Sequence, residues 1–274
     1  MEKHKFRDTD LALERKRAPN EKGVLYKETA MGDIRFSALT VTENAKGGEL
    51  PVGKTLSVSL PAFFFSNGEE RKQFLDAIRL ALQVFFPVPP ARLLVAGLGN
   101  RRLTADALGP MTAERIDASA ALPRALGEQF KIPSFTRTAV SIPDVFPRTG
   151  IESVYTVRAA ARLHKADAVL TVDALAAREK ERLLRVIEIT DTGSVPGGGV
   201  KRGTLALSKK TLGVPVVAIG VPTVVRMGEE HFLVSRGMED ELHVISGCLA
   251  EAINLHFGGD TPIEGDLISS LFEG

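Results

Sequence analysis

The chain has 274 residues, of which 44% are hydrophobic, enough for one large or two modest globular domains. Its 35 Lys and Arg residues nearly balance 34 Asp and Glu residues, so no overall charge favours nucleic acid or an anionic membrane as a partner. No apolar run approaches the roughly 20 residues that span a bilayer, the start is charged, and the single Cys248 excludes an internal disulfide. We expect a soluble, intracellular protein.

The first third of the chain predicts a charged tail, then strands, then a helix. Residues 1–22 are densely charged around one apolar trio at 11–13, and we expect this segment not to pack stably. Residues 33–60 alternate between apolar and polar side chains, which predicts half-exposed β-strands. Residues 69–86 carry apolar side chains at helical spacing up to Pro87, which predicts a helix.

Beyond residue 90, strands that are apolar on both faces alternate with helical patterns, as in a parallel sheet covered on both sides. The expected strands are 92–98, 167–173, 184–190 and 214–220, and the expected helices are 106–119, 151–165, 174–183 and 239–256. The segment of about 120–150 reads as an insertion with one or two edge strands. The predicted fold is a single, mostly parallel α/β domain with a β-rich N-terminal elaboration.

Two Asp-Ala-Leu sequences follow apolar runs and put Asp106 and Asp173 at expected strand ends. Ligands and reactions in parallel α/β sheets gather outside the carboxyl ends of the strands. An aspartate at this place also caps a following helix through the free N–H groups of its first turn. Asp191 follows another expected strand, and the residues alone leave capping and a functional cluster equally open.

A pair of carboxyl groups has a definite chemical use. Like charges a few ångströms apart raise one pKa, so that one group is ionised and the other protonated. The ionised group can take a proton from water while its partner protonates a carbonyl or a leaving amine. Asp191-Thr192-Gly193 matches a pepsin-type motif, but the α/β context makes this a chance match, and Asp191 stays a possible third carboxylate.

Two glycine-rich stretches resemble phosphate-binding motifs, but neither matches a complete one. After Gly97 and Gly99, a dinucleotide fingerprint needs a third glycine where Arg102 stands, and a tight turn with close backbone approach is favoured. Residues 196–203, with Gly198, lack the ending of a P-loop and predict a loop beside the site. The five histidines lack metal-ligand spacing, so no metal or cofactor is expected.

Long motifs in a fixed order carry a family resemblance over residues 8–257. They are "TDLALE", "LLVAGLGNRRLTADALGP", "TGIES", "ADAVLTVDALAAR", "IEITDTGSVPGGGV" and "TLGVPVVAIGVPTVV". The chain resembles the germination protease family, atypical aspartic endopeptidases that degrade small acid-soluble spore proteins. The resemblance implies a fold like that of hydrogenase-maturation endopeptidases, a homotetramer, and a location in the forespore or spore-core cytoplasm.

The resemblance also implies roles for particular residues. The family's two proposed catalytic aspartates correspond to Asp106 and Asp173, and we expect Gly97, Gly99 and Asn100 to shape the rim, with Asn100 helping to bind the carbonyl. If a helix follows Asp173, its N-terminus favours the ionised form, and Asp106 is then the partner that holds the proton.

The family's members are zymogens that remove a short N-terminal segment by self-cleavage. Their substrates are cut after an acidic residue in a Thr-Glu-Ile-Ala-Ser-Glu-like sequence, which "TDLALE" at 9–14 resembles. We therefore expect cleavage between Asp10 and Leu11, giving a pro-segment of residues 1–10 and a peptidase domain of residues 11–274. Mild acid is an expected trigger, because protonation of carboxylates in the tail would release its contacts.

Departures from the family pattern affect the surroundings of the site more than its chemistry. The chain has "PDVFPRTG" where a "PGV"-like turn is common, and Lys209-Lys210 where acidic residues are usual. Two alternatives remain: a metal-dependent peptidase in which the carboxylates are ligands, and a non-catalytic protein that binds a small ligand.

Overall fold

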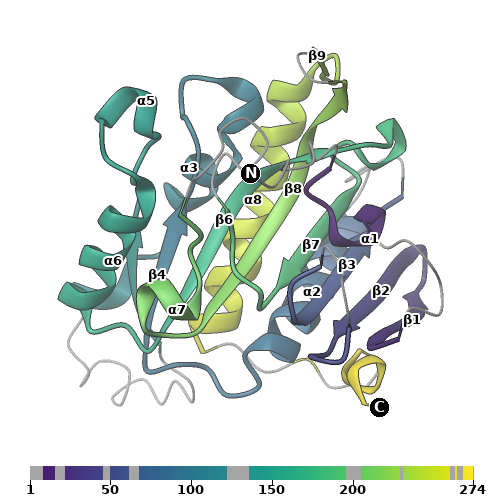
Figure 1. The fold of residues 1–274 in the computed structure, drawn as a ribbon, viewed down its shortest axis with the longest axis horizontal. Coiled ribbons are helices and arrows are strands. Elements are labelled where there is room, and N and C mark those ends of the chain that lie inside the picture. The colour runs from purple at the N-terminus through teal and green to yellow at the C-terminus, as the bar shows by residue number, and fades with distance from the viewer. Residues whose placement is uncertain are drawn as a thin grey trace.

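The computed structural model describes residues 9–15, 22–45, 50–61, 68–121, 136–195, 205–228, 231–259, 263 and 268–273. Within these ranges the chain forms one 9-stranded mixed sheet (Figure 1). Eight strands follow the order β1-β2-β3-β7-β8-β6-β4-β5, and β9 pairs with β8. The expected α/β architecture is therefore present, with strands from both halves of the chain in one sheet.

The core of the sheet is parallel. Its strands are β5 (Arg137–Ser141), β4 (Arg92–Gly97), β6 (Ala168–Ala177) and β8 (Val216–Met227), in that spatial order. The insertion predicted near 120–150 supplies β5 as an edge strand, and residues 122–135 lie outside the described part. Parallel strands place their carboxyl ends at one edge, which is where the sequence predicts a site.

The rest of the sheet is antiparallel. β1 (Val24–Met31), β2 (Ile34–Val41) and β3 (Gly53–Ser59) form a meander, and β3 pairs with β7 (Val186–Thr190). β7 runs antiparallel to β8, as does β9 (His231–Leu233). The β-rich N-terminal part thus extends the parallel core sideways through β7.

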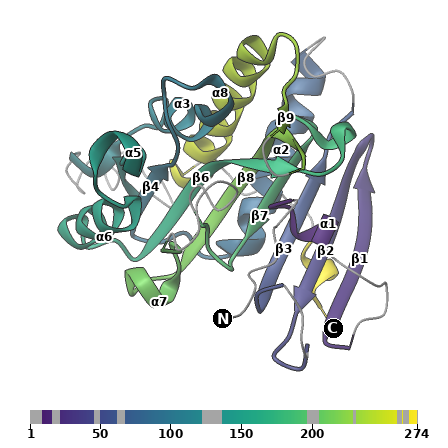
Figure 2. The ribbon, with the colours of Figure 1, turned by 45° about the horizontal axis from the view of Figure 1, so that its top comes forward.

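Helices cover both faces of the sheet (Figure 2). α2 (Gly68–Phe85), α3 (Leu108–Ala113) and α8 (Met238–Phe257) pack on one face, and α6 (Ser153–His164) and α7 (Lys209–Leu212) pack on the other. The short elements are α1 (Ala12–Arg15), α5 (Phe146–Thr149), η1 (Thr104–Asp106), η2 (Ser119–Ala121), η3 (Lys180–Arg182) and η4 (Ser269–Phe272). No described helix combines the length and apolarity needed to cross a bilayer.

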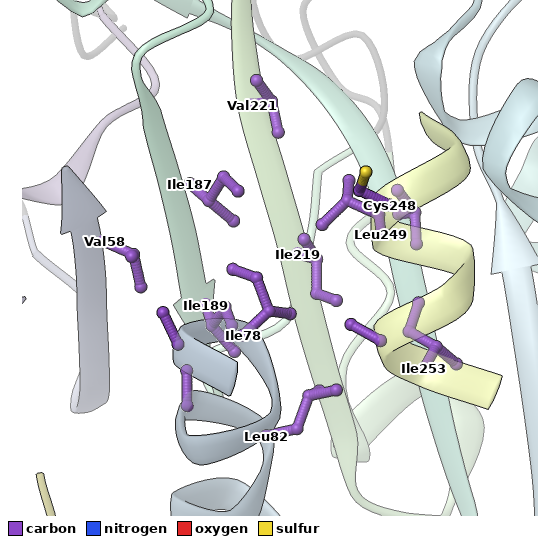
Figure 3. Packing of buried hydrophobic residues seen from close by; sticks show 14 of the residues in the cluster. Val58, Ile78, Leu82, Ile187, Ile189, Ile219, Val221, Cys248, Leu249 and Ile253 are labelled. Carbon is purple, nitrogen blue, oxygen red and sulfur yellow. The ribbon is translucent and has the colours of Figure 1, made fainter. Parts of the chain in front are cut away.

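The main core lies between the sheet and the pair α2 and α8. Ile78 of α2 and Leu249 of α8 face Ile189 and Ile219 of the sheet, and all four side chains are at most 1% exposed (Figure 3). Burial of a large aliphatic side chain contributes about 1.5–3 kcal/mol. This apolar layer fixes the register of the strands whose opposite face carries the polar site.

The helix expected over 174–183 is wrong. β6 continues past Asp173 to Ala177 and pairs with β8 as far as Val225, with an irregularity between Leu175 and Ala176. The long β8 offers main-chain hydrogen bonds along this whole stretch, and that pairing outweighs the helical propensity of its Ala and Leu residues. Asp173 therefore lies inside a strand, and the expected helix over 106–119 is reduced to η1 and the six residues of α3.

The expectation that the N-terminal tail does not pack is also wrong for its described residues, 9–15. Leu11 is fully buried against Ala177 and Val225, and Ala12 packs on the β1–β2 hairpin. α1 lies beside β7 and β3 in both views of the fold (Figures 1 and 2). The apolar residues 11–13 of the charged tail therefore pack against the sheet.

Candidate active site

Asp173 is the buried member of the predicted pair. It lies in the middle layer of the sheet between β4 and β8, and only 5% of the residue is exposed. Its Oδ2 accepts a hydrogen bond from Ser194 Oγ at 3.3 Å, and its Oδ1 accepts one from the Ala174 N–H at 2.9 Å. Burial raises the pKa of Asp173 well above its usual value, and the negative charge of nearby Asp106 raises it further.

Asp106 ends η1, in the loop that follows β4, and is half-buried. Its Oδ2 accepts a hydrogen bond from the Asn100 N–H at 2.8 Å. Burial raises the pKa of Asp106, the Asn100 N–H opposes that rise, and the charge of Asp144 adds to it. The charge of Asp106 acts on Asp173, so the structure places the two carboxyl groups near each other, Asp173 on β6 and Asp106 in the loop after the neighbouring β4.

The pattern of burial reverses the expected assignment of the proton. No helix follows Asp173, so the dipole that would favour its ionised form is missing from this described stretch. Asp173 is more deeply buried and feels the charge of Asp106, whereas Asp106 keeps a main-chain N–H that stabilises its carboxylate. Burial and charge therefore both favour the proton on Asp173, with Asp106 as the ionised partner.

Glycines permit this close approach of the two aspartates. A Cβ on Gly109 would lie 2.2 Å from Leu98 O and 2.3 Å from Val172 O, so α3 packs directly on the backbone of β4 and β6. A Cβ on Gly99 would lie 2.1 Å from Asp106 O, and Gly99 has a φ of +114°. Of the two glycines that suggested nucleotide binding, Gly99 instead lets Asp106 sit over the end of β4, and Gly97 lets α3 pack on that strand, since its Cβ would lie 2.3 Å from Gly109 O.

The crowding at Gly99 makes a testable prediction. We expect Gly99→Ala to lower the free energy of unfolding by about 1–3 kcal/mol and to reduce activity, because the new methyl group displaces Asp106. Chemical denaturation measures the first effect. The matched control is Gly32→Ala, which also has a positive φ, +58°, but has nothing within 4 Å of the new Cβ. Equal effects on activity would contradict a role of Gly99 in placing Asp106.

The other predicted supporting residues lie in different places. Asn100 flanks Asp106, and its Oδ1 accepts bonds from Arg102 N at 3.0 Å and Arg148 Nη1 at 3.3 Å, so its side chain orders the rim loop. Its role in carbonyl binding stays a prediction. Asp191 follows the antiparallel β7 and lies at the opposite end of the sheet, where it accepts a bond from Lys54 N at 2.7 Å. Gly198 lies outside the described residues.

Sequence reasoning missed two groups near the pair and a third on the same sheet face. Ser194 bonds to Asp173, and Asp144 adds negative charge beside Asp106. Glu188 shares a register row with Asp173 across Gly220 of β8 and is only 6% exposed. The alternating pattern of β7 signals that one face carries Glu188, but only the sheet order shows that this face meets the site.

The N-terminal segment lies against the same strand as Asp173. Asp10 N donates to Ala176 O at 2.8 Å, and Ala176 N donates to Asp10 Oδ2 at 2.9 Å. The charge of Asp10 also contributes to the raised pKa of Asp173. The bond expected to be processed, Asp10–Leu11, thus follows a residue that is held on β6, three residues beyond Asp173, by one main-chain hydrogen bond and one bond to its own side chain.

The described residues contain no group of three or more His, Cys, Asp or Glu side chains suited to holding a metal ion. What the arrangement offers chemically is two carboxyl groups with raised pKa values, on the strand and loop next to a bound peptide segment. Such a pair can activate water and protonate a carbonyl oxygen.

Comparison with known proteins identifies the family of the chain. Residues 1–229 match the model of a family described as germination protease, peptidase family A25. The chain is 32% identical over 228 residues to a germination protease of Clostridium perfringens, covering 79% of this chain and 70% of that protein. It is 36% identical over 233 residues to that of Bacillus subtilis, covering 79% of this chain and 62% of that protein.

A germination protease of Oceanobacillus iheyensis is 36% identical over 239 residues, covering 79% of this chain and 63% of that protein. Among solved structures, a NiFe hydrogenase maturation protease, HycI from Thermococcus kodakarensis, aligns with 64% of this chain and 99% of its own, at 20% identity and a TM-score of 0.39. The family match covers most of the chain and includes both aspartates. The chain therefore belongs to the germination protease family, a family of peptidases.

Proposed function

We propose that this protein is an endopeptidase that cleaves small acid-soluble spore proteins during germination, and that it is made as a zymogen which cuts itself between Asp10 and Leu11. The observation that carries the proposal is the position of this segment. Asp10 forms two hydrogen bonds with Ala176, three residues beyond Asp173 on the same strand. A peptide bound in this way lies beside one protonated and one ionised aspartate.

The mechanism follows from the two protonation states. The Asp106 carboxylate takes a proton from a water molecule, whose oxygen then attacks the scissile carbonyl carbon. The Asp173 carboxyl donates its proton to the carbonyl oxygen, giving a neutral tetrahedral diol. When the C–N bond breaks, the proton now on Asp106 passes to the leaving nitrogen and a diol proton returns to Asp173, so that the pair ends as it began.

The binding mode suits an unfolded substrate. The N-terminal segment makes one main-chain hydrogen bond to β6 and accepts a second β6 N–H on its Asp10 side chain, and extended peptides bind other proteins along an open strand edge in a related way. A disordered spore protein can occupy the same place without first unfolding. In this proposal the enzyme acts as a homotetramer in the forespore and spore core, on protein substrates and not on nucleic acid or membranes.

The test uses the full-length chain. After transfer to mildly acidic buffer, intact-mass spectrometry should show loss of residues 1–10 and a new N-terminus at Leu11. Dilution distinguishes cleavage within one chain from cleavage between chains, because only the first has a rate independent of protein concentration. A chain that stays full length, and that leaves an acid-soluble spore protein uncut, would overturn the proposed function.

A further inference from the structure

Glu188 is a buried carboxyl group that the proposed mechanism does not use. It projects from β7 in the same register row as Asp173, with Gly220 of β8 between them, and the residue is 6% exposed. Burial raises the pKa of Glu188 to about 7, so ionisation of this side chain costs stability in the folded protein. An apolar side chain would avoid that cost, which indicates that the carboxylate has a use at this place.

The Glu188 carboxylate binds the backbone of the N-terminal segment. Ala12 N lies 3.0 Å from Oε1 and 3.0 Å from Oε2 of Glu188, so both oxygens share one N–H. The two residues are 176 positions apart in the chain, so this is a contact between separate elements and not a local turn. A hydrogen bond to an ionised acceptor is stronger than one to a neutral acceptor. Because the donor belongs to the main chain, the contact does not depend on the side chain of residue 12.

A second buried polar group lies next to Glu188 on the same face of the sheet. Ser57 of β3 is the register partner of Glu188, and the residue is 0% exposed. Its Oγ is buried and has no hydrogen-bond partner within the described part of the chain. A buried hydroxyl without a partner costs free energy, and register partners on antiparallel strands lie directly opposite each other. The carboxylate and the hydroxyl therefore form one polar place on a sheet whose other face is apolar.

The bond expected to be cut lies between two anchored residues. Asp10 is held on β6 by its bonds with Ala176 at 2.8 and 2.9 Å, and Ala12 is held on β7 by Glu188. These two strands lie on either side of β8. Because one residue on each side of the Asp10–Leu11 bond is fixed, that bond has a defined position across the sheet. A defined position of the reacting group is a large part of what catalysis requires.

We propose that Glu188 is a substrate-binding residue that accepts the main-chain N–H of the second residue after the cleaved bond. The inference rests on the proposed cleavage between Asp10 and Leu11, which makes Ala12 that second residue. Every amino acid except proline offers this N–H. The contact therefore places different substrate chains in the same way without selecting their side chain at this position, and it disfavours a proline there.

The test removes one N–H from the substrate and leaves every side chain in place. Two peptides span residues 5–18 of this chain, one natural and one in which an ester oxygen replaces the Ala12 N–H. With the enzyme that matures from the full-length chain, we expect kcat/KM for the ester peptide to be about 10- to 100-fold lower, the range for a hydrogen bond to a charged group. The loss should fall mainly on KM, because residue 12 does not take part in the reacting bond. Equal kcat/KM for the two peptides would overturn the inference and leave the peptidase function standing.

Variants of the enzyme test whether Glu188 is the group that binds this N–H. In Glu188→Leu the two peptides should be cleaved with nearly equal kcat/KM, because no acceptor is left, whereas Glu188→Gln keeps one oxygen and should retain part of the difference. Glu181→Gln is the matched control, because it removes a carboxylate of η3 whose side chain is 70% exposed, and the full difference should remain. If Glu188→Leu kept the wild-type ratio between the peptides, Glu188 would act on the fold alone and the inference would be wrong.

A binding measurement keeps the inference testable without cleavage. Leu11→Asp in the full-length chain should release the N-terminal segment, because Leu11 is 0% exposed among apolar side chains that do not tolerate an ionised carboxylate. Fluorescence anisotropy then gives the Kd of this variant for the two labelled peptides. A Kd about 10- to 100-fold lower for the natural peptide supports the inference even if no bond is cut, an outcome that would contradict only the proposed function. Equal affinities, or no binding of either peptide, would overturn the inference.

Discussion

Asp106→Asn and Asp173→Asn are each expected to lower the rate of self-cleavage about 10²- to 10⁴-fold, the usual contribution of a positioned acid or base. Asn at 106 cannot take a proton from water, and Asn at 173 cannot give one to the carbonyl oxygen. The measurement is the fraction of full-length chain that converts to the Leu11 N-terminus with time, read by intact mass. If either variant matured at the wild-type rate, that residue would have no part in the chemistry.

The matched control for both variants is Asp191→Asn. Asp191 also follows an apolar strand, but it lies at the opposite end of the sheet, and an asparagine oxygen can still accept the bond from Lys54 N. We expect this variant to mature normally. Misfolding is a poor explanation for inactivity of Asp173→Asn, because the carboxyl group it replaces is buried and its pKa is raised well above the usual value. Its free energy of unfolding at neutral pH should match or exceed that of the wild type.

Glu188→Gln is expected to remove a pH-dependent contribution to the free energy of unfolding that amounts to roughly 3 kcal/mol between acid and alkaline pH. Burial raises the pKa of Glu188 to about 7 from 4.5, against the opposing effects of the Ala12 N–H and the charges of Arg15 and Arg182. Each unit of difference between the pKa values of the folded and unfolded chain contributes about 1.4 kcal/mol to the free energy of unfolding. Because the folded-state pKa is the higher one, the stabilising contribution is complete below pH 4.5 and is lost as the pH rises through 7.

The measurement is the free energy of unfolding by denaturant across this pH range. The wild type should lose stability relative to Glu188→Gln as the pH rises, because only the wild type must ionise a buried side chain. Glu43→Gln is the control, since Glu43 is exposed, and its difference from the wild type should stay constant with pH. Parallel curves for wild type and Glu188→Gln would show that Glu188 is not the titrating group.

This linkage changes the expected effect of acid on the N-terminal segment. Asp10 adds to the raised pKa of Asp173, so by reciprocity a lower pH favours docking of the segment through this group. Glu188 acts in the opposite direction, because the Ala12 N–H and the charge of Arg15 lower its pKa, so that its ionised form favours docking. The sequence alone suggested only that acid would release the tail, and the structure adds Asp173 as a group through which acid strengthens its contacts.

How far the sequence could predict the structure depended on the range of the interactions involved. Two-sided apolar runs correctly identified β4 and β6, and the helical stripe correctly identified α2, because each signal lies within one element. The stretch after Asp173 was mispredicted because its conformation depends on β8, some 50 residues later in the chain. The direction of β7, which moves Asp191 away from the pair, is likewise a property of strand pairing.

The residues of the candidate site could likewise be predicted from the sequence only where the signal is local. The repeated Asp-Ala-Leu sequences identified Asp106 and Asp173, and the structure brings the two together. Ser194 reaches this face through an isolated bridge to Leu207, and the alternation in β7 puts Glu188 on one face without showing that this face meets the site. Which aspartate holds the proton depends on burial, a quantity that no spacing of residues encodes.

The complete burial of Leu11 also affects what happens after the proposed cut. Hydrolysis of the Asp10–Leu11 bond would turn a neutral amide nitrogen into an α-ammonium group beside a side chain that is 0% exposed. An ammonium group in such surroundings must either find a carboxylate or regain water, and transfer to water is strongly favoured over an apolar site. The Glu188 carboxylate already binds the next N–H along the segment and is placed to take that charge, so the cut would replace a neutral contact of the segment with an ion pair to Glu188.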